Sequence, residues 1–186
     1  MENTPNTPAP RLVMDAPGIE RALKRVAHEI IEAHGELDRV ALAGIPTRGV
    51  FVAQRLAAFL KTFAGADVEA GVIDVSMHRD DLGRRKRMTS MQPTRLPADL
   101  EGKTMILTDD VLFSGRTVRA AMDALASFGR PARIQLAVLV DRGHRELPIR
   151  PDYVGLNLPT APGQRVDVRF QEIDGEPDAV WIDRKP

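Results

Sequence analysis

The sequence has no cysteine among its 186 residues. Disulfides, thiolate nucleophiles and cysteine-ligated zinc are therefore excluded, and a reducing compartment fits this composition. No apolar run approaches the roughly 20 residues that span a bilayer, and the N-terminus lacks the apolar segment of a signal peptide. We therefore expect a soluble, cytoplasmic protein without a membrane partner.

An excess of charge is also missing, because 26 Lys and Arg residues balance 26 Asp and Glu residues. Any basic surface must therefore be local. The four histidines show no H-x-x-x-H spacing, which disfavours a metal held by protein alone. The absence of G-x-x-x-x-G-K-[S/T] excludes a Walker P-loop, and the absence of G-x-G-x-x-G disfavours a dinucleotide site.

Apolar strands alternate with amphipathic helices along the chain. The length and the 43% hydrophobic content favour one compact domain. The alternation predicts an α/β fold with a parallel sheet. We expect a flexible tail over residues 1–17 and a domain over 18–186. Strands are predicted at 39–45, 68–77, 104–108, 134–140, 166–170 and 180–182, and helices at 18–34, 50–63 and 117–128.

Three unusual segments, 44–49, 78–97 and 109–117, each follow a predicted strand. In parallel sheets ligands bind at the carboxyl ends of the strands, so we expect the three segments to converge on one site. The 78–97 segment is long, polar and rich in arginine. Such a segment is either a flexible lid over bound ligand or a solvated run of charge.

The most informative motif runs from Thr108 to Thr117, where an apolar strand leads into Asp109 and Asp110 and then into a tight loop and a helix. The N-terminus of a helix presents free N–H groups to a phosphate. Carboxylates accept hydrogen bonds from sugar hydroxyls or bind a metal that phosphates already hold. Two solvated acids are the weaker alternative, because neighbouring carboxylates repel each other. The motif predicts a ribose 5-phosphate site whose phosphate loop comprises Val111, Leu112, Phe113, Ser114, Gly115, Arg116 and Thr117.

This motif resembles the 5-phosphoribosyl-1-pyrophosphate (PRPP) signature of type I phosphoribosyltransferases. From Ile19 to Ile182 the chain resembles, more narrowly, the pyrimidine operon attenuator/uracil phosphoribosyltransferase family. The narrower resemblance is carried by RVAHE at 25–29, GIPTRG at 44–49, RDDL at 79–82 and VLVDRGHRELPIR at 138–150.

The resemblance implies a type I phosphoribosyltransferase fold, with a mainly parallel sheet flanked by helices and a small hood subdomain from about residue 142 onward. It implies a glycosyltransferase that converts uracil and PRPP into UMP and pyrophosphate with Mg²⁺. It also implies a regulator of pyrimidine genes that senses UMP or UTP, binds the leader messenger RNA and acts by transcription attenuation. Family members assemble, so a homo-oligomer, a dimer or larger, is expected.

The site residues carry the following expectations. Asp109, Asp110 and Arg79 are the catalytic candidates. The pyrophosphate loop comprises Thr47, Arg48 and Gly49, although a simple strand-to-helix turn is the alternative. The base site is expected at Asp141, Arg142, Tyr153 and Val154, with a core tyrosine as the alternative for Tyr153.

The RNA-binding candidates lie on one helix and on the segment after residue 143. They are Lys24, Arg25, His28, His144, Arg145 and Arg150. Leu156 and Pro46 stand where the family commonly has basic residues or histidine, which weakens this basic surface. Three alternatives therefore remain: a sensing regulator with little catalysis, a uracil enzyme without RNA binding, and a phosphoribosyltransferase for purines or orotate.

Overall fold

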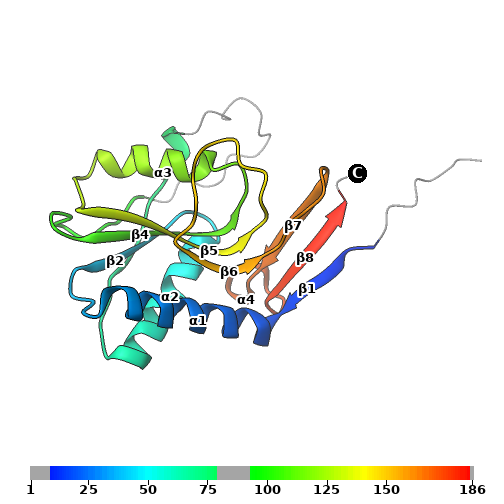
Figure 1. Ribbon diagram of the computed structural model, residues 1–186, viewed down its shortest axis with the longest axis horizontal. Helices are drawn as coiled ribbons and strands as arrows, with labels where there is room; N and C mark the ends of the chain where they lie inside the picture. Colours follow the sequence, from blue (N-terminus) through cyan, green and yellow to red (C-terminus); the bar gives the residue numbers. More distant parts are fainter. Residues whose placement is uncertain (1–8, 79–92, 185–186) are drawn as a thin grey trace, which may run out of the picture.

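The computed structural model of the chain describes residues 9–78 and 93–184. Its main sheet has five strands in the order β3-β2-β4-β5-β6, and every neighbouring pair is parallel (Figure 1). The α/β fold expected from the alternation is therefore confirmed. The strands are β2 (Val40–Gly44), β3 (Ala70–Val72), β4 (Thr104–Leu112), β5 (Arg133–Asp141) and β6 (Tyr153–Asn157).

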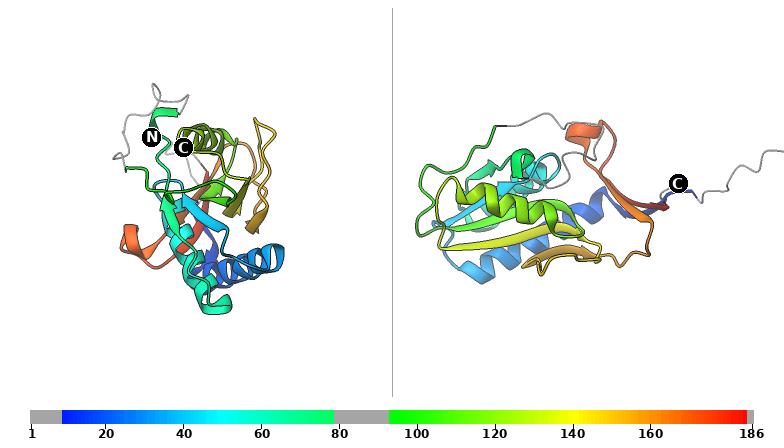
Figure 2. Two further views of the ribbon diagram at one scale, coloured as in Figure 1. Left: turned by 90° about the vertical axis from the view of Figure 1, so that its left-hand side faces the viewer. Right: turned by 90° about the horizontal axis from the view of Figure 1, so that it is seen from above.

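Helices cover both faces of this sheet. The helices α1 (Ala16–His34) and α2 (Gly49–Ala64) lie on one face, and α3 (Arg116–Ala126) lies on the other with the short 3-10 helix η1 (Ser76–His78) (Figures 1 and 2). Each face has its own hydrophobic core, one under α1 and α2 and one under α3. These helices and the sheet together fix the carboxyl ends of the main strands, where the candidate site lies.

A second, antiparallel sheet of order β1-β8-β7 stands beyond the carboxyl ends of the main strands (Figure 1). It consists of β1 (Arg11–Asp15), β7 (Gln164–Arg169) and β8 (Ala179–Arg184), and the short helix α4 (Gln171–Asp174) joins β7 to β8. We name this sheet together with α4 the hood.

Two predicted boundaries are wrong at the N-terminal end of the chain. Residues 1–17 were expected as a flexible tail, but Arg11–Asp15 pair with β8 and α1 begins at Ala16. The carboxylate of Asp15 accepts a hydrogen bond from the Gly18 N–H at 2.9 Å, which caps the helix two residues earlier than predicted. Residues 1–8 lie outside the described residues.

Three other boundaries also differ. The strand predicted at 68–77 shrinks to β3, because the chain after Val72 leaves the sheet and turns into η1. The strand predicted at 104–108 continues to Leu112, since β4 keeps pairing with β5 up to Asp141. The hood does not begin at residue 142, because β6 belongs to the main sheet.

The predicted lid falls mostly outside the described residues, since 79–92 are not among them. Within its described part, Arg95 bridges to Val72 by two backbone hydrogen bonds of 2.7 and 2.8 Å, so this end of the segment is tied to the sheet. Among the described residues, no helix is long and apolar enough to cross a membrane.

Candidate active site

Two acidic residues occupy the carboxyl-terminal half of β4, the central strand of the sheet. Asp109 is only 8% exposed, and Asp110 is partly buried. One carboxylate oxygen of Asp109 accepts the Asp110 N–H at 2.9 Å. The strand was expected to end before the pair, but β4 continues through it to Leu112 and pairs with β5 at Asp109 and Val111.

Burial raises the pKa of Asp110 and outweighs the hydrogen bond from Asp109 and the charge of Arg48, which lower it. The Asp110 carboxyl is therefore more costly to ionise than an exposed one. A bound sugar hydroxyl or a cation would offset that cost, so a ligand with those groups fits this position.

The phosphate loop follows directly and turns into α3. Gly115 has φ 91°, a left-handed value that favours glycine, and the helix begins at Arg116. The Ser114 hydroxyl accepts the Arg116 N–H at 3.4 Å, while the Arg116 side chain pairs with Glu146 at 2.6 Å. The predicted phosphate loop thus leads directly into the N-terminus of α3.

The segment after β5 holds the phosphate loop in place. The Ser114 carbonyl accepts two hydrogen bonds, from the N–H groups of Glu146 and Leu147 at 3.0 and 3.2 Å. Arg145 donates to the Phe113 carbonyl at 2.9 Å and pairs with Asp141 at 2.5 Å. The motif that carried the narrower resemblance is therefore in contact with the PRPP motif.

The predicted pyrophosphate loop lies beside the acidic pair. The Ile45 N–H donates to the Thr108 carbonyl at 2.9 Å, and the Thr108 hydroxyl donates to the Gly49 carbonyl at 2.7 Å. Between them, the peptide bond from Pro46 to Thr47 is cis. The segments 44–49 and 109–117 thus converge as expected, whereas Arg79 lies outside the described residues.

A hollow at the carboxyl ends of β5 and β6 is the candidate site for the base. Arg142 donates to the Thr160 hydroxyl at 3.2 Å and the Gln164 carbonyl at 2.8 Å, and its guanidinium stacks on Phe113 at 4.2 Å. Burial lowers the pKa of Arg142. The lining residues are Asp141, Arg142, Gly143, His144, Asn157, Pro159 and Thr160.

Tyr153 and Val154, which were also predicted for the base, do not line this hollow. They start β6, whereas the hollow lies where β6 ends. Tyr153 is 5% exposed, and its hydroxyl contacts His34 and Gln135 at 3.3 Å, so the core alternative is correct. Asn157 and Thr160 were missed, because no strand was predicted at 153–157 to mark its carboxyl end.

The RNA-binding candidates form two groups. On α1, Lys24 pairs with Glu20 at 2.6 Å, Arg25 donates to the Val154 and Gly155 carbonyls, and His28 stacks on Phe63 at 4.3 Å. The second group has a half-buried Arg145 and exposed His144 and Arg150.

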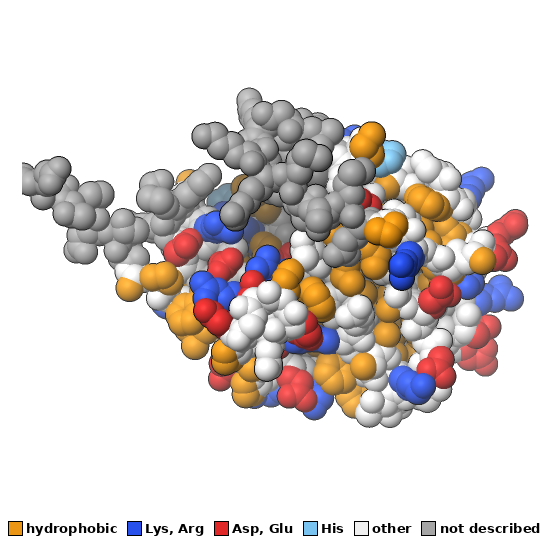
Figure 3. Space-filling view, turned by 180° about the vertical axis from the view of Figure 1, so that it is seen from behind, with side chains coloured by type: hydrophobic (Ala, Val, Ile, Leu, Met, Phe, Trp, Pro, Cys, Tyr) orange, Lys and Arg blue, Asp and Glu red, His pale blue; other side chains and the backbone are white. Residues whose placement is uncertain are grey.

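In the α1 group, Lys24 pairs with Glu20 and Arg25 pairs with Glu29 on the same helix, so the positive charge of the group is partly neutralised. On the described part of the face in Figure 3, Lys and Arg side chains are interspersed with Asp and Glu. Leu156 is only partly exposed in β6.

Among the described residues, no group of three His, Asp or Glu side chains could hold a metal ion. The acidic pair nevertheless offers hard carboxylate oxygens of the type that Mg²⁺ accepts. Mg²⁺ fits this site when the oxygens of a bound phosphate ligand complete its coordination.

Comparison with known proteins places this geometry in a family. Residues 13–173 match the phosphoribosyl transferase domain. A bifunctional protein PyrR of Leifsonia xyli subsp. xyli is 53% identical over 179 residues, which cover 93% of this chain and 96% of that protein. The bifunctional protein PyrR of Thermus thermophilus is 53% identical, over 88% of this chain and 91% of that one.

Solved structures share the fold at lower identity. The hypoxanthine phosphoribosyltransferase of Trypanosoma cruzi, in complex with the product IMP, superposes with a TM-score of 0.67 at 18% identity, over 94% of this chain and 90% of that one. A Staphylococcus aureus hypoxanthine phosphoribosyltransferase also reaches 0.67, at 16% identity over 97% and 96%. The acidic pair before α3, the matched domain and the identity to these relatives all point to the same family. The chain belongs to the phosphoribosyl transferase family and, within it, to the bifunctional PyrR proteins.

Proposed function

We propose that the protein is a cytoplasmic uracil phosphoribosyltransferase that converts uracil and PRPP into UMP and pyrophosphate. The observation that carries this proposal is the placement of Asp109 and Asp110 near the end of β4, beside the loop of Arg48 and one short loop before α3. Carboxylates that accept from sugar hydroxyls, N–H groups that donate to a phosphate and the Arg48 guanidinium thus lie near one another. This combination suits a phosphorylated sugar with a pyrophosphate group.

In the reaction, the bond between C1 of the ribose and the pyrophosphate oxygen breaks, and uracil N1 forms the new bond to C1. The N1 proton leaves to the pyrophosphate or to water. The sugar becomes oxocarbenium-like, as in glycoside transfer. Asp109 and Asp110 hold the ribose hydroxyls, and their negative charge favours the positive charge that develops on the sugar.

The two phosphate ends are held apart from each other. Residues 114–117 bind the 5-phosphate through N–H groups and hydroxyls, and Arg48 binds the pyrophosphate. Mg²⁺, when bound through Asp109 or Asp110 and the ligand, supplies charge neutralisation for the leaving group. The hollow around Arg142 and Asn157 holds the base against C1, which lowers the barrier by orientation.

The test is pyrophosphate release by the purified protein with PRPP and Mg²⁺, with uracil, orotate, hypoxanthine or guanine as the base. We expect release only with uracil. Release with hypoxanthine or guanine would replace this proposal by the purine alternative.

Replacing Thr117 with valine should weaken PRPP and UMP together, because both ligands carry the same 5-phosphate. The expected loss is about tenfold for each, which corresponds to one hydrogen bond to a charged group. Calorimetry measures both affinities. Thr62→Val is the matched control, since Thr62 bonds only along its own helix, to the Ala58 carbonyl at 2.9 Å. If the variant loses PRPP affinity but keeps UMP affinity, the assignment of the 5-phosphate to this loop is wrong.

A second function is favoured by the relatives, which are named bifunctional. We propose that the protein also binds the leader RNA of pyrimidine genes when UMP or UTP is bound, as a homo-oligomer. The exposed Arg150 is the available contact on the segment after β5. His144 is also exposed, but its Nε2 already bonds the Thr160 carbonyl at 2.6 Å. Phosphates and unpaired bases are the expected targets.

Replacing Arg150 with alanine should weaken RNA binding and reduce its salt slope by about one unit, as expected for the loss of one phosphate contact. A gel shift with the leader, with and without UMP, at several salt concentrations measures this. Arg165→Ala is the control, because Arg165 is exposed on the hood. A leader that never shifts, even with UMP, rejects the regulatory function and leaves the enzyme proposal intact.

A further inference from the structure

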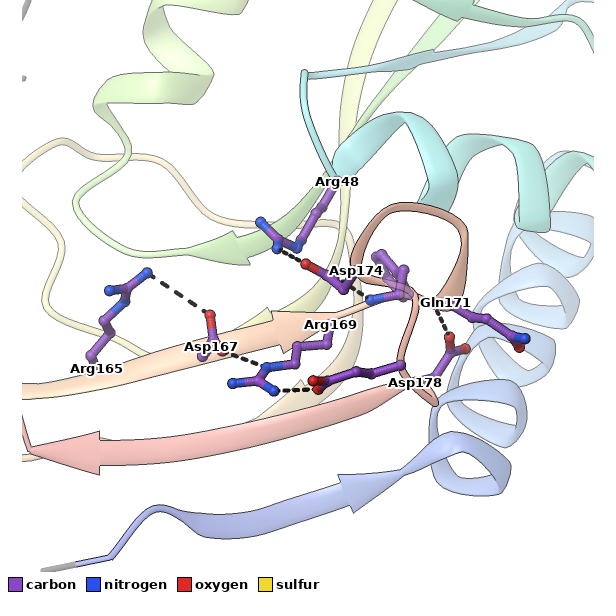
Figure 4. Close-up of polar contacts among 9 residues, drawn as sticks. Arg48, Arg165, Asp167, Arg169, Gln171, Asp174 and Asp178 are labelled. Carbon is purple, nitrogen blue, oxygen red and sulfur yellow. Dashed lines mark hydrogen bonds and ion pairs between the residues drawn. The ribbon is translucent and has the colours of Figure 1, made fainter. Parts of the chain in front are cut away.

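Arg48 in the pyrophosphate loop is bound by an acidic residue from the hood. Its Nη2 donates to one carboxylate oxygen of Asp174 at 2.6 Å, and the side chains are 29% and 21% exposed (Figure 4). Asp174 is the last residue of α4 and lies 126 positions after Arg48 in the sequence. This contact joins the loop before α2 to the hood.

The Asp174 carboxylate is itself fixed. Its second oxygen accepts the Phe170 N–H at 2.8 Å, so both oxygens are engaged. Phe170 is fully buried and packs against Phe51 of α2. Asp174 therefore fixes the position of the Arg48 side chain, because its carboxylate cannot rotate without losing the hydrogen bond from the Phe170 N–H.

A second arginine anchors α4 to the same helix. Arg55 forms two hydrogen bonds with Glu172, at 3.0 and 2.8 Å, and it also pairs with Asp178. Its guanidinium lies 4.6 Å from the centre of the Phe170 ring. The helix α4 therefore cannot move independently of α2, and Asp174 keeps its place relative to Arg48.

Arg48 retains donors beyond this contact. Its Nε is buried and has no hydrogen-bond partner, which is costly unless a ligand oxygen or water is present. Its charge also acts on Asp110 and favours that carboxylate. Arg48 thus lies between the acidic pair and the hood.

We propose that Asp174 is a positioning residue, which holds Arg48 by one nitrogen so that its remaining N–H groups face the leaving pyrophosphate. This rests on the proposed phosphoribosyl transfer. The Asp174 carboxylate has two opposite effects on bound PRPP, since it orients Arg48 but repels the pyrophosphate. These effects offset each other in ground-state binding. As the bond to C1 breaks, negative charge grows on the pyrophosphate, and the orientation of Arg48 then matters more than the repulsion from Asp174. Loss of the Asp174 carboxylate should therefore lower kcat.

The test variant is Asp174→Asn, which keeps the size of the side chain. An asparagine replaces one of the two accepting oxygens by an NH₂ donor, so either Phe170 N–H or Arg48 would face a donor instead of an acceptor. We expect kcat for UMP formation to fall about tenfold, with the KM for PRPP changed less than about threefold. Asp167→Asn is the matched control, because Asp167 is a hood aspartate that pairs with Arg165 and Arg169 (Figure 4). It should keep the wild-type kcat.

A double-mutant cycle separates positioning from a general loss of structure. In an Arg48→Gln background, Asp174→Asn should lower kcat by less than about twofold, because its effect passes through Arg48. An equal tenfold loss in both backgrounds, or a wild-type kcat in Asp174→Asn, would overturn the assignment. Wild-type protein without uracil-dependent turnover would instead reject the proposed function. Thermal unfolding of each variant checks that the fold is retained.

Discussion

Replacing Asp110 with asparagine should lower kcat for UMP formation by about a hundredfold or more. Asparagine keeps the size of the side chain but removes the negative charge that faces the developing oxocarbenium-like sugar. Loss of one preorganised electrostatic contact in a transition state typically costs a factor of this size. The KM for uracil should change little, because the hollow for the base lies at Arg142 and Asn157, at the ends of other strands.

The same substitution should not destabilise the fold at neutral pH. Burial raises the pKa of Asp110 above its ordinary value of 3.8, so the native state keeps the proton to a higher pH than the unfolded chain. The free energy of unfolding therefore falls as pH rises from about 4 through the raised pKa. Asp110→Asn removes this dependence and should equal or exceed the wild-type stability at pH 7.

Steady-state kinetics and urea unfolding at pH 4 to 8 measure both quantities on the same protein. Ser127→Ala, after the end of α3, is a control that should change neither. Full turnover in Asp110→Asn would show that the carboxylate has no role in the reaction. A variant that loses stability at pH 7 would show that the charge of Asp110 stabilises the unliganded fold.

Replacing Gly49 with alanine should nearly abolish turnover. A Cβ at Gly49 would overlap the Thr108 carbonyl oxygen and lie 3.1 Å from the Asp109 Cα. Both are backbone atoms of the central strand, which cannot give way as a flexible side chain would. The pyrophosphate loop must therefore move away from the acidic pair, at a cost of about 1–3 kcal/mol in stability and a loss of about a hundredfold in kcat.

Gly65→Ala is the matched control at the other end of α2. Gly65 has φ 68° and no atom within 4 Å of the added Cβ, so the substitution costs backbone strain of about 1 kcal/mol without a collision. Its kcat should remain at the wild-type value. If Gly49→Ala and Gly65→Ala have the same kcat, the close contact between the loop and β4 does not align the site.

All strands of the main sheet except β6 could be predicted from local signals. Apolar runs separated by amphipathic helices indicated the strands, and glycines ended α1 and α2 where expected, with Gly35 and Gly65 at the two helix ends. The PRPP motif was recognisable because a phosphate site needs glycine, hydroxyls and carboxylates in consecutive positions. These features depend on residues that are close together in the sequence, so they can be recognised without the structure.

The hood could be predicted only in part, because strands were expected at 166–170 and 180–182, within or near β7 and β8, but not at β1. The strand β1 has only five residues and is stabilised by pairing with β8, more than 160 positions away. Asp174 belongs to no local motif, and its role depends on meeting Arg48 in space. Tyr153 was misassigned for a related reason, since an unrecognised strand gave no indication of which of its ends faces the ligand. Long-range contacts decide each of these features.

The pairing of β1 with β8 makes the two ends of the described chain interdependent. On a ribosome, residues up to about Leu112 can form much of the main sheet, but the hood must wait for Ala179–Arg184 to emerge. A truncation that removes β8 would leave both β1 and β7 without the strand with which they pair. The hood, and with it the contact of Asp174 with Arg48, should therefore form only after β8 has been synthesised.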